Sequence, residues 1–578
     1  MIYLFFLPSD IENALIYKES PNVEILNYFR KKYPDIEWVF EYLYQRDFKK
    51  FDIEKLINLN AKKRYITSIL NVLLEDLSKK NLKDSIFKIY QRYKNYYDQK
   101  SYEITFFALK DTSILFEFSK KFPSSKLLLN FVNKVNFGSL VKAQILYYNE
   151  KYKEVVETVE PESALYFYVD ALSKLNNFQK AGEICKKYKT TNFRKADYFF
   201  ECSLNLLEIG DTISAFEFLD SLYEYNPEIA IRHSSYIAIS SKNYTLFFKT
   251  FKDTNIPEVQ FRKALVYYAQ KEYIRAISTL EKIIKITNDK FELSRAYYWL
   301  YKLTKNDDYL KKISKISPNG YYALITGFFP KIIDTTFYDE SKFENYQKPI
   351  VLEILGFRSE FWKFLTNENK IYLAYMLNKI GSYDLAIELA ESSISLITPK
   401  DILIMAYPTP YFEEFLNASA KSGIEIELLY AIVREESKFD KNVISPAGAM
   451  GIAQIMPEDF KRWSRKLNVP YKPFDIRINL LVGAMHFKEF LEKLNYDISL
   501  TICAYNAGIN AVNNWLKILD YSDSDLFFEI IPYRETRNYY RRVMRSYIVY
   551  KFLFSRKTWN YGLYLPLKFI TCAHSSTG

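Results

Sequence analysis

Two consecutive glutamates, Glu435 and Glu436, end an apolar stretch and could supply a proton-donating carboxyl. The spacing of apolar residues predicts one helix over 423–437. At about 100° per residue, Glu436 projects near the middle of the apolar stripe and Glu435 towards its edge. A carboxyl held against apolar neighbours has its charged form destabilised, which raises its pKa towards the range where it donates a proton near neutral pH. Glu436 is therefore the candidate general acid. The stripe comprises residues about one turn apart: Leu428, Leu429, Ile432 and Val433.

The helix alone does not decide the role of Glu436. A carboxyl at a helix end is more commonly solvated or paired with Arg or Lys. Glu425 shares the azimuth of Glu436, but it lies in the first turn, where the helix dipole favours a solvated carboxylate. The segments downstream are therefore needed to decide whether Glu436 is a general acid or a solvated or paired carboxyl.

Three downstream segments combine turn residues with polar side chains. In 439–457, two Gly and two Pro break up the helical pattern around Gln454 and Met456. Residues 504–508 read Ala-Tyr-Asn-Ala-Gly, and 531–540 open a basic, Tyr-rich helix. Dense turn chemistry of this kind is typical of loops that approach a ligand.

These segments resemble the motifs of the soluble lytic murein transglycosylases. The matching motifs are Glu-Ser, Ser-Pro-x-Gly-Ala-x-Gly-x-x-Gln-Ile-Met-Pro, Ala-Tyr-Asn-Ala-Gly and Glu-Thr-Arg, in order between Glu436 and Arg537. The resemblance implies a goose-lysozyme-like C-terminal domain whose catalytic acid/base is Glu436. It also implies that Tyr505 hydrogen-bonds the catalytic carboxyl. Groove residues that bind substrate fall on five matched positions: Ser445, Gln454, Met456, Asn506 and Glu535.

Simpler roles are open for several of these residues. Gln454 could satisfy loop backbone, Asn506 could form a turn, and Glu535 could favour a helix N-terminus. Two positions depart from the family pattern, because Ala453 stands where the family often has Met and Glu435 where it often has Gln. The first change is expected to loosen one sugar subsite. The second adds a negative charge that would raise the pKa of Glu436 further if the two are close.

The resemblance implies cleavage of the MurNAc-GlcNAc linkage of peptidoglycan without water, leaving 1,6-anhydro ends. Glycosidases usually need two carboxylates about 5–10 Å apart, and the matched motifs assign only Glu436. No metal and no cofactor is expected. Two alternatives stay open: a goose-type lysozyme of the same fold, and an inactive helical scaffold that binds glycan or protein.

The rest of the chain must position this site. Hydrophobic residues make up 49% of the 578 residues, with only 14 Gly and 19 Pro, which predicts an all-α protein of several domains. Helical hairpins with Ala beside large rings recur, as in tetratricopeptide repeats. Examples are 143–156, 171–181, 264–277 and 372–387. Most of the aromatic residues, 18% of the chain, are expected in the core because they recur at helical spacing.

Composition shifts predict four segments. Residues 1–330 form an α-superhelical domain, 331–405 a helical linker, 406–565 the lysozyme-like catalytic domain and 566–578 a tail. The apolar start, residues 1–8, lacks the basic region of a signal peptide. A location in the periplasm or cell envelope is therefore inferred from the substrate.

Charge and cysteine content limit the classes of binding partner that we expect. The net charge of +11 is spread along the chain without a nucleic-acid fingerprint, so nucleic acid is not expected as a partner. No run of about 20 apolar residues is present, so at most a peripheral membrane association is expected. Peptidoglycan strands are the expected partner, with cell-wall proteins as possible partners of the helical domain. The four cysteines, Cys185, Cys202, Cys503 and Cys572, show no close spacing and are predicted to be free buried thiols.

Overall fold

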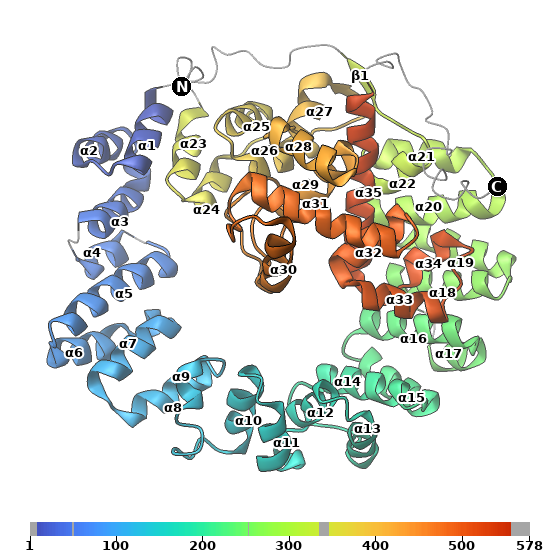
Figure 1. The fold of residues 1–578 in the computed structure, drawn as a ribbon, viewed down its shortest axis with the longest axis horizontal. Coiled ribbons are helices and arrows are strands. Elements are labelled where there is room, and N and C mark those ends of the chain that lie inside the picture. The colour runs from blue at the N-terminus through green and yellow to red at the C-terminus, as the bar shows by residue number, and fades with distance from the viewer. Residues whose placement is uncertain (1–8, 49–50, 60, 252–253, 334–345, 556–578) are drawn as a thin grey trace. The chain divides into compact units, whose positions relative to one another are not determined.

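The protein is almost entirely helical. The computed structural model describes residues 9–48, 51–59, 61–251, 254–333 and 346–555, and the expectations for residues 1–8, Cys572 and the tail 566–578 lie outside them. Within these ranges the strands are β1 (Lys331–Ile333) and β2 (Ile397–Pro399), which pair in parallel. The all-α class is confirmed, although the expected linker also contains this strand pair (Figure 1). No described helix combines the length and apolarity needed to cross a membrane.

The described residues form two compact units, one within residues 9–230 with 347–363 and the other within residues 231–333 and 346 with 364–555. The first unit contains α1 (Ser9–Glu19), α2 (Val23–Lys32), α3 (Glu37–Phe48), α4 (Ile53–Asn58), α5 (Lys63–Lys79), α6 (Lys83–Tyr93), α7 (Gln99–Leu109), α8 (Thr112–Lys121), α9 (Lys126–Leu129), α10 (Ser139–Tyr148), α11 (Tyr152–Thr158), α12 (Leu165–Lys174), α13 (Phe178–Lys187), α14 (Lys195–Glu208), α15 (Thr212–Tyr223), α23 (Gln347–Ile354) and α24 (Arg358–Phe361).

The boundary between the units falls inside α16 (Pro227–Ser241). The second unit continues with α17 (Tyr244–Thr250), α18 (Pro257–Ala269), α19 (Tyr273–Ile286), α20 (Lys290–Thr304), α21 (Asp308–Ile316), α22 (Tyr321–Ile325), α25 (Lys370–Lys379), α26 (Tyr383–Glu391), α27 (Lys400–Ala406), α28 (Phe412–Ser422), α29 (Ile426–Ser437), α30 (Pro457–Leu467), α31 (Ile476–Lys493), α32 (Ile498–Ala507), α33 (Ile509–Ile518), α34 (Ser524–Ile530) and α35 (Arg534–Phe554).

Neighbouring helices in the first unit pack as hairpins, as the sequence predicted. Helices α12, α13, α14 and α15 contact one another in succession. Ala143, Ala171 and Ala181 in these hairpins are fully buried. Large rings pack between the same helices, as where Tyr147 of α10 lies against Phe167 of α12 with centroids 5.2 Å apart. Alternating small and large side chains thus allow close helix packing.

The second unit joins helical hairpins to the C-terminal helices. The Arg262 side chain on α18 donates to the Glu529 carbonyl on α34 at 2.5 Å, and the Tyr322 hydroxyl on α22 donates to the Glu529 carboxylate at 2.6 Å. Lys302 on α20 pairs with Asp523 at 2.6 Å, just before α34 begins. Packing therefore divides the chain differently from the boundaries at 330 and 405, which follow the kind of element and stay a prediction.

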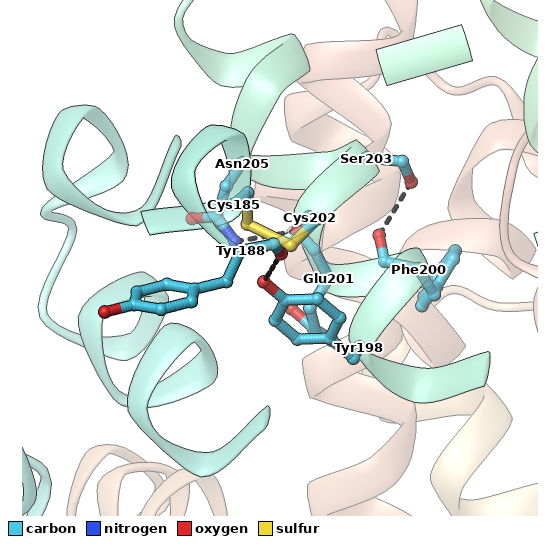
Figure 2. Close-up of a disulfide and its surroundings, with 8 residues drawn as sticks. All are labelled: Cys185, Tyr188, Tyr198, Phe200, Glu201, Cys202, Ser203 and Asn205. Carbon is cyan, nitrogen blue, oxygen red and sulfur yellow. Dashed lines mark hydrogen bonds between the residues drawn. A yellow bond between two sulfur atoms is a disulfide. The ribbon is translucent and has the colours of Figure 1, made fainter. Parts of the chain in front are cut away.

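The prediction that all four cysteines are free thiols is wrong for two of them. Cys185 on α13 and Cys202 on α14 form a disulfide with Cα atoms 5.6 Å apart (Figure 2). Beside it, the Tyr198 hydroxyl donates to the Tyr188 carbonyl at 2.5 Å. The pairing depends on which faces of two neighbouring helices meet, which the cysteine spacing does not reveal. Cys503 is a buried free thiol, as predicted.

Reduction of this disulfide is expected to destabilise the first unit. The bond closes a loop with a sequence separation of 17 residues, and a loop of this size contributes about 3 kcal/mol through the unfolded state. Thermal unfolding of the wild type should shift down with reductant, while the double variant Cys185→Ala/Cys202→Ala should be insensitive to it. A digest of unreduced protein that lacks the linked Cys185–Cys202 peptide would contradict the pairing.

Candidate active site

Helix α29 carries both glutamates and is fixed by rings from its neighbours. The Tyr430 ring stacks on Phe415 of α28 with centroids 3.8 Å apart and lies against Tyr550 of α35 at 5.4 Å. All four residues of the predicted apolar stripe are buried. The helix ends where Lys438 adopts a left-handed conformation (φ 49°). The Glu425 side chain, at the other end, is 49% exposed and pairs with Lys551 at 2.6 Å.

The Glu436 carboxyl is partly buried, and this burial dominates its ionisation. Loss of water raises its pKa to about 7, against the Tyr539 hydroxyl and Arg542, which lower it. The neighbouring carboxylates Glu435 and Glu535 raise the pKa further. The carboxyl is therefore divided between its protonated and ionised forms near neutral pH, as a group that first donates and then accepts a proton requires.

Glu435 lies in a cluster of arginines. It pairs with Arg434 at 2.5 Å and with Arg542 at 3.3 Å, and it accepts a hydrogen bond from the Ser546 hydroxyl at 2.6 Å. Burial acts to raise the pKa of Glu435, but the arginines, led by Arg434 and Arg545, bring it down to about 2. The two consecutive glutamates thus have opposite character, Glu435 permanently ionised and Glu436 able to carry a proton.

Two tyrosines interact with Glu436, and their roles differ from the expectation. The Tyr505 hydroxyl, on α32, donates to the Ala453 carbonyl at 2.8 Å instead of to Glu436, with which it interacts electrostatically. Tyr539, on α35 and 2% exposed, lowers the pKa of Glu436, so its hydroxyl lies near that carboxyl. Among the described residues, the Tyr539 hydroxyl has no hydrogen-bond partner.

The loop between α29 and α30 is shaped by its own backbone. Gly451 (φ 74°) is required because a Cβ there would lie 2.2 Å from the Pro473 carbonyl. The Gln454 side-chain amide donates to the carbonyls of Gly451 and Val443, at 2.7 and 3.1 Å. The Ser445 hydroxyl accepts from the Ala449 amide at 3.0 Å. These side chains therefore stabilise the loop, the simpler role that the sequence had left open for Gln454.

The other predicted groove residues lie at helix ends. The Met456 side chain is 43% exposed just before α30. Asn506, near the end of α32, accepts from the Thr536 hydroxyl at 2.7 Å and so joins α32 to the first turn of α35. Glu535 is exposed in that same turn, close enough to affect the ionisation of Glu436.

Asn479 on α31 is a residue that the motifs did not identify. Its side chain accepts from the Ala453 amide at 2.8 Å and donates to the carbonyls of Met450 and Pro473, at 3.1 and 2.7 Å. It is fully buried, and it fixes the loop against α31. A polar residue inside the apolar run of this helix was the available signal.

Residues 413–527 match the model of the Transglycosylase SLT domain. The chain carries an SLT domain. It is 28% identical over 206 residues to a putative soluble lytic murein transglycosylase of Haemophilus influenzae, covering 34% of each chain. It is also 28% identical over 163 residues to the soluble lytic murein transglycosylase of Escherichia coli K12, covering 27% of this chain and 25% of that one. The chain thus aligns with about a third or less of the length of these curated relatives.

Solved structures extend the likeness in fold beyond the SLT domain. An inactive mutant of lytic transglycosylase Slt from Pseudomonas aeruginosa is similar over 95% of this chain and 97% of its own, with a TM-score of 0.54 and 16% identity. The 70 kDa soluble lytic transglycosylase of E. coli is similar over 94% and 96%, with a TM-score of 0.51 and 15% identity. The predicted all-α fold class with helical hairpins is confirmed.

Substitution of Asn479 is expected to loosen the loop between α29 and α30. Asn479→Ala leaves two carbonyls and one amide without their partner, at about 1–3 kcal/mol for each buried group. The thermal midpoint should fall by several degrees, whereas Asn510→Ala, at an exposed position on α33, should leave it unchanged. Equal midpoints for the two variants would show that the loop does not depend on Asn479.

Burial of Glu436 should make stability depend on pH. Its pKa is raised in the folded protein to about 7 from an ordinary value of 4.5, so its stabilising effect is present below pH 4.5 and is lost as the pH rises to 7. Glu436→Gln cannot ionise, and its thermal midpoint relative to the wild type should rise between pH 5 and pH 8. Glu425→Gln serves as the control, since that side chain is half exposed. A pH-independent difference for Glu436→Gln would show that this carboxyl is not desolvated.

Proposed function

We propose that this protein is a peptidoglycan lytic transglycosylase that cleaves the MurNAc-GlcNAc β-1,4 bond and leaves 1,6-anhydro-MurNAc ends. The observation that carries the proposal is one partly buried carboxyl, Glu436, with its pKa raised to about 7 inside a matched SLT domain. The named activity of the curated relatives supports the same reaction class.

Glu436 performs both proton transfers. In its protonated form it donates to the glycosidic oxygen as the bond to C1 of MurNAc breaks, and the substrate's acetamido group stabilises the cationic centre. The resulting carboxylate then removes the proton from the 6-hydroxyl of the same sugar, whose oxygen bonds to C1. Tyr539 lies near the carboxylate and stabilises it between the two steps. The proton returns to Glu436, and no water is consumed.

The state of Glu435 supports a mechanism with a single carboxyl. A nucleophile or second base must be free to approach the sugar, whereas Glu435 is bound by Arg434, Arg542 and Ser546. Glu535 is exposed and electrostatically coupled to Glu436. It favours a second candidate function, hydrolysis of the goose-lysozyme type, with Glu535 orienting a water molecule.

The glycan strand is proposed to contact Ser445, Gln454, Met456, Asn506 and Glu535. For Ser445, Gln454 and Asn506 this role would add to the structural one described above. Cell-wall proteins are the proposed partners of the helical hairpins, and nucleic acid is not a proposed partner. A location in the periplasm or cell envelope follows from the substrate and is supported by the disulfide, since such bonds persist in oxidising compartments.

Glu436→Gln is expected to reduce turnover of purified sacculi at least about 10²-fold, because general acid–base catalysis of this kind contributes roughly 10²–10⁴-fold. Release of soluble muropeptides measures turnover, and mass spectrometry of the wild-type products reads the chemistry. Anhydro ends support the transglycosylase and reducing ends the hydrolase. Glu425→Gln, which changes the carboxyl at the N-cap of the same helix, should retain activity. Wild-type turnover that survives in Glu436→Gln would remove the assignment.

A further inference from the structure

We propose that Glu435 is a positioning residue that holds the Arg542 guanidinium away from Glu436, and so keeps the catalytic carboxyl free to carry its proton. The proposal rests on the proposed function of Glu436. It assigns a task to the second glutamate, which the reaction itself does not use.

Arg542 is paired with Glu435 and lies near enough to Glu436 to influence it electrostatically. Its Nε is 3.3 Å from the Glu435 carboxylate, and its guanidinium carbon is 6.0 Å from the ring centre of Tyr539, the tyrosine that interacts with Glu436. The Arg542 side chain is 46% exposed, in contrast to 7% for Glu435, so the arginine has room to change rotamer. If Glu435 lost its charge, Glu436 would become the carboxylate available to this cation.

Glu435 is itself too firmly held to follow Arg542. Its Oε1 is bound by Arg434 at 2.5 Å and by the Ser546 hydroxyl at 2.6 Å, and Arg545 lies 3.7 Å away. Its Oε2 pairs with Arg542. Oε1 therefore holds Glu435 in place, and Oε2 is paired with Arg542.

Charged and titratable groups from three helices lie around Glu436. Tyr539, Arg542 and Glu535 face it from α35, Tyr505 interacts with it from α32, and Glu435 precedes it on α29. Arg542 is a cation that lowers the pKa of Glu436. The position of Arg542 therefore affects whether Glu436 carries its proton.

The test is the pH profile of kcat/KM in the full-length protein on purified sacculi. Protonated Glu436 is the active form, so activity is lost as the pH rises through its pKa. Glu435→Gln should shift this alkaline limb down by roughly 1 unit or more, the usual effect of a newly paired opposite charge. Arg542→Gln should shift the limb up. In the Arg542→Gln background, adding Glu435→Gln should have little further effect.

Glu391→Gln is the matched control. Glu391 binds Arg434 and Arg545 of the same cluster, at 2.6 and 2.7 Å, but is not paired with Arg542. It should leave the alkaline limb in place even if the thermal midpoint falls. Should Glu435→Gln fail to fold, Glu435→Asp keeps the charge beside Arg434 but shortens its reach to Arg542, and should shift the limb in the same direction.

Two results would overturn the proposal: an unchanged limb in a folded Glu435 variant, or an equal shift in the presence and absence of Arg542. The second result would mean that Glu435 acts through its own charge or through stability. Failure of the proposed function is separately visible, because the wild type would then release no muropeptides or Glu436→Gln would remain active.

Discussion

The candidate active site depends on removing one carboxyl from water without pairing it with a cation. The packing of α29 against α35 brings the apolar stripe of α29 out of solvent, and Glu436 at the end of that stripe is desolvated with it. The same packing needs cations, because Glu435 is buried beside Glu436 and requires compensation. Helices α29 and α35 are therefore joined by arginines that lie near Glu436. An arginine paired with Glu436 would suppress its proposed function as a proton donor. Separation of the two glutamates into a paired and an unpaired carboxyl resolves this conflict.

Local periodicity was sufficient to place Glu436 on the apolar side of its helix, while the downstream motifs were needed to propose its role. The side of a helix that a residue occupies follows from a repeat of 3.6 residues. The partners of Glu436 could not be obtained in the same way. Tyr539 lies about 100 residues further along the chain, and only the packing of α35 on α29 shows that it lies near the carboxyl, whereas the Tyr505 hydroxyl is bound to the Ala453 carbonyl. The Cys185–Cys202 disulfide was missed for the same reason, since a contact between two helix faces has no local signature.

The motif around Gln454 shows a different limit of the sequence. Motif matching identifies residues that the fold needs as well as residues that touch substrate. In the motif around Gln454, the structure shows a residue that stabilises the fold. Gln454, itself in a left-handed conformation (φ 52°), uses its amide on the backbone of its own loop. Asn479 fixes the same loop from α31, and Gly483 on that helix leaves room for it, since a Cβ there would lie 2.7 Å from that of Ala453. Ala453 also receives the Tyr505 hydrogen bond, so the small side chain at this departure from the family pattern lies where three elements meet.

Helix α35 packs against neighbours on two sides. This explains why no boundary between the two compact units falls near residue 406, where the sequence predicted the start of the C-terminal domain. One face carries Tyr539, Arg542 and Ser546 to the glutamates of α29. On another, Arg541 pairs with Glu529 at 2.6 Å, and the same Glu529 carboxylate accepts from Tyr322 of the helical hairpins. Buried groups of this kind are costly to leave unpaired, so the register of α35 is fixed jointly by α29 and by α18–α22. The hairpins preceding the SLT domain are thus part of what places the Tyr539 hydroxyl near Glu436 and the Arg542 guanidinium on Glu435.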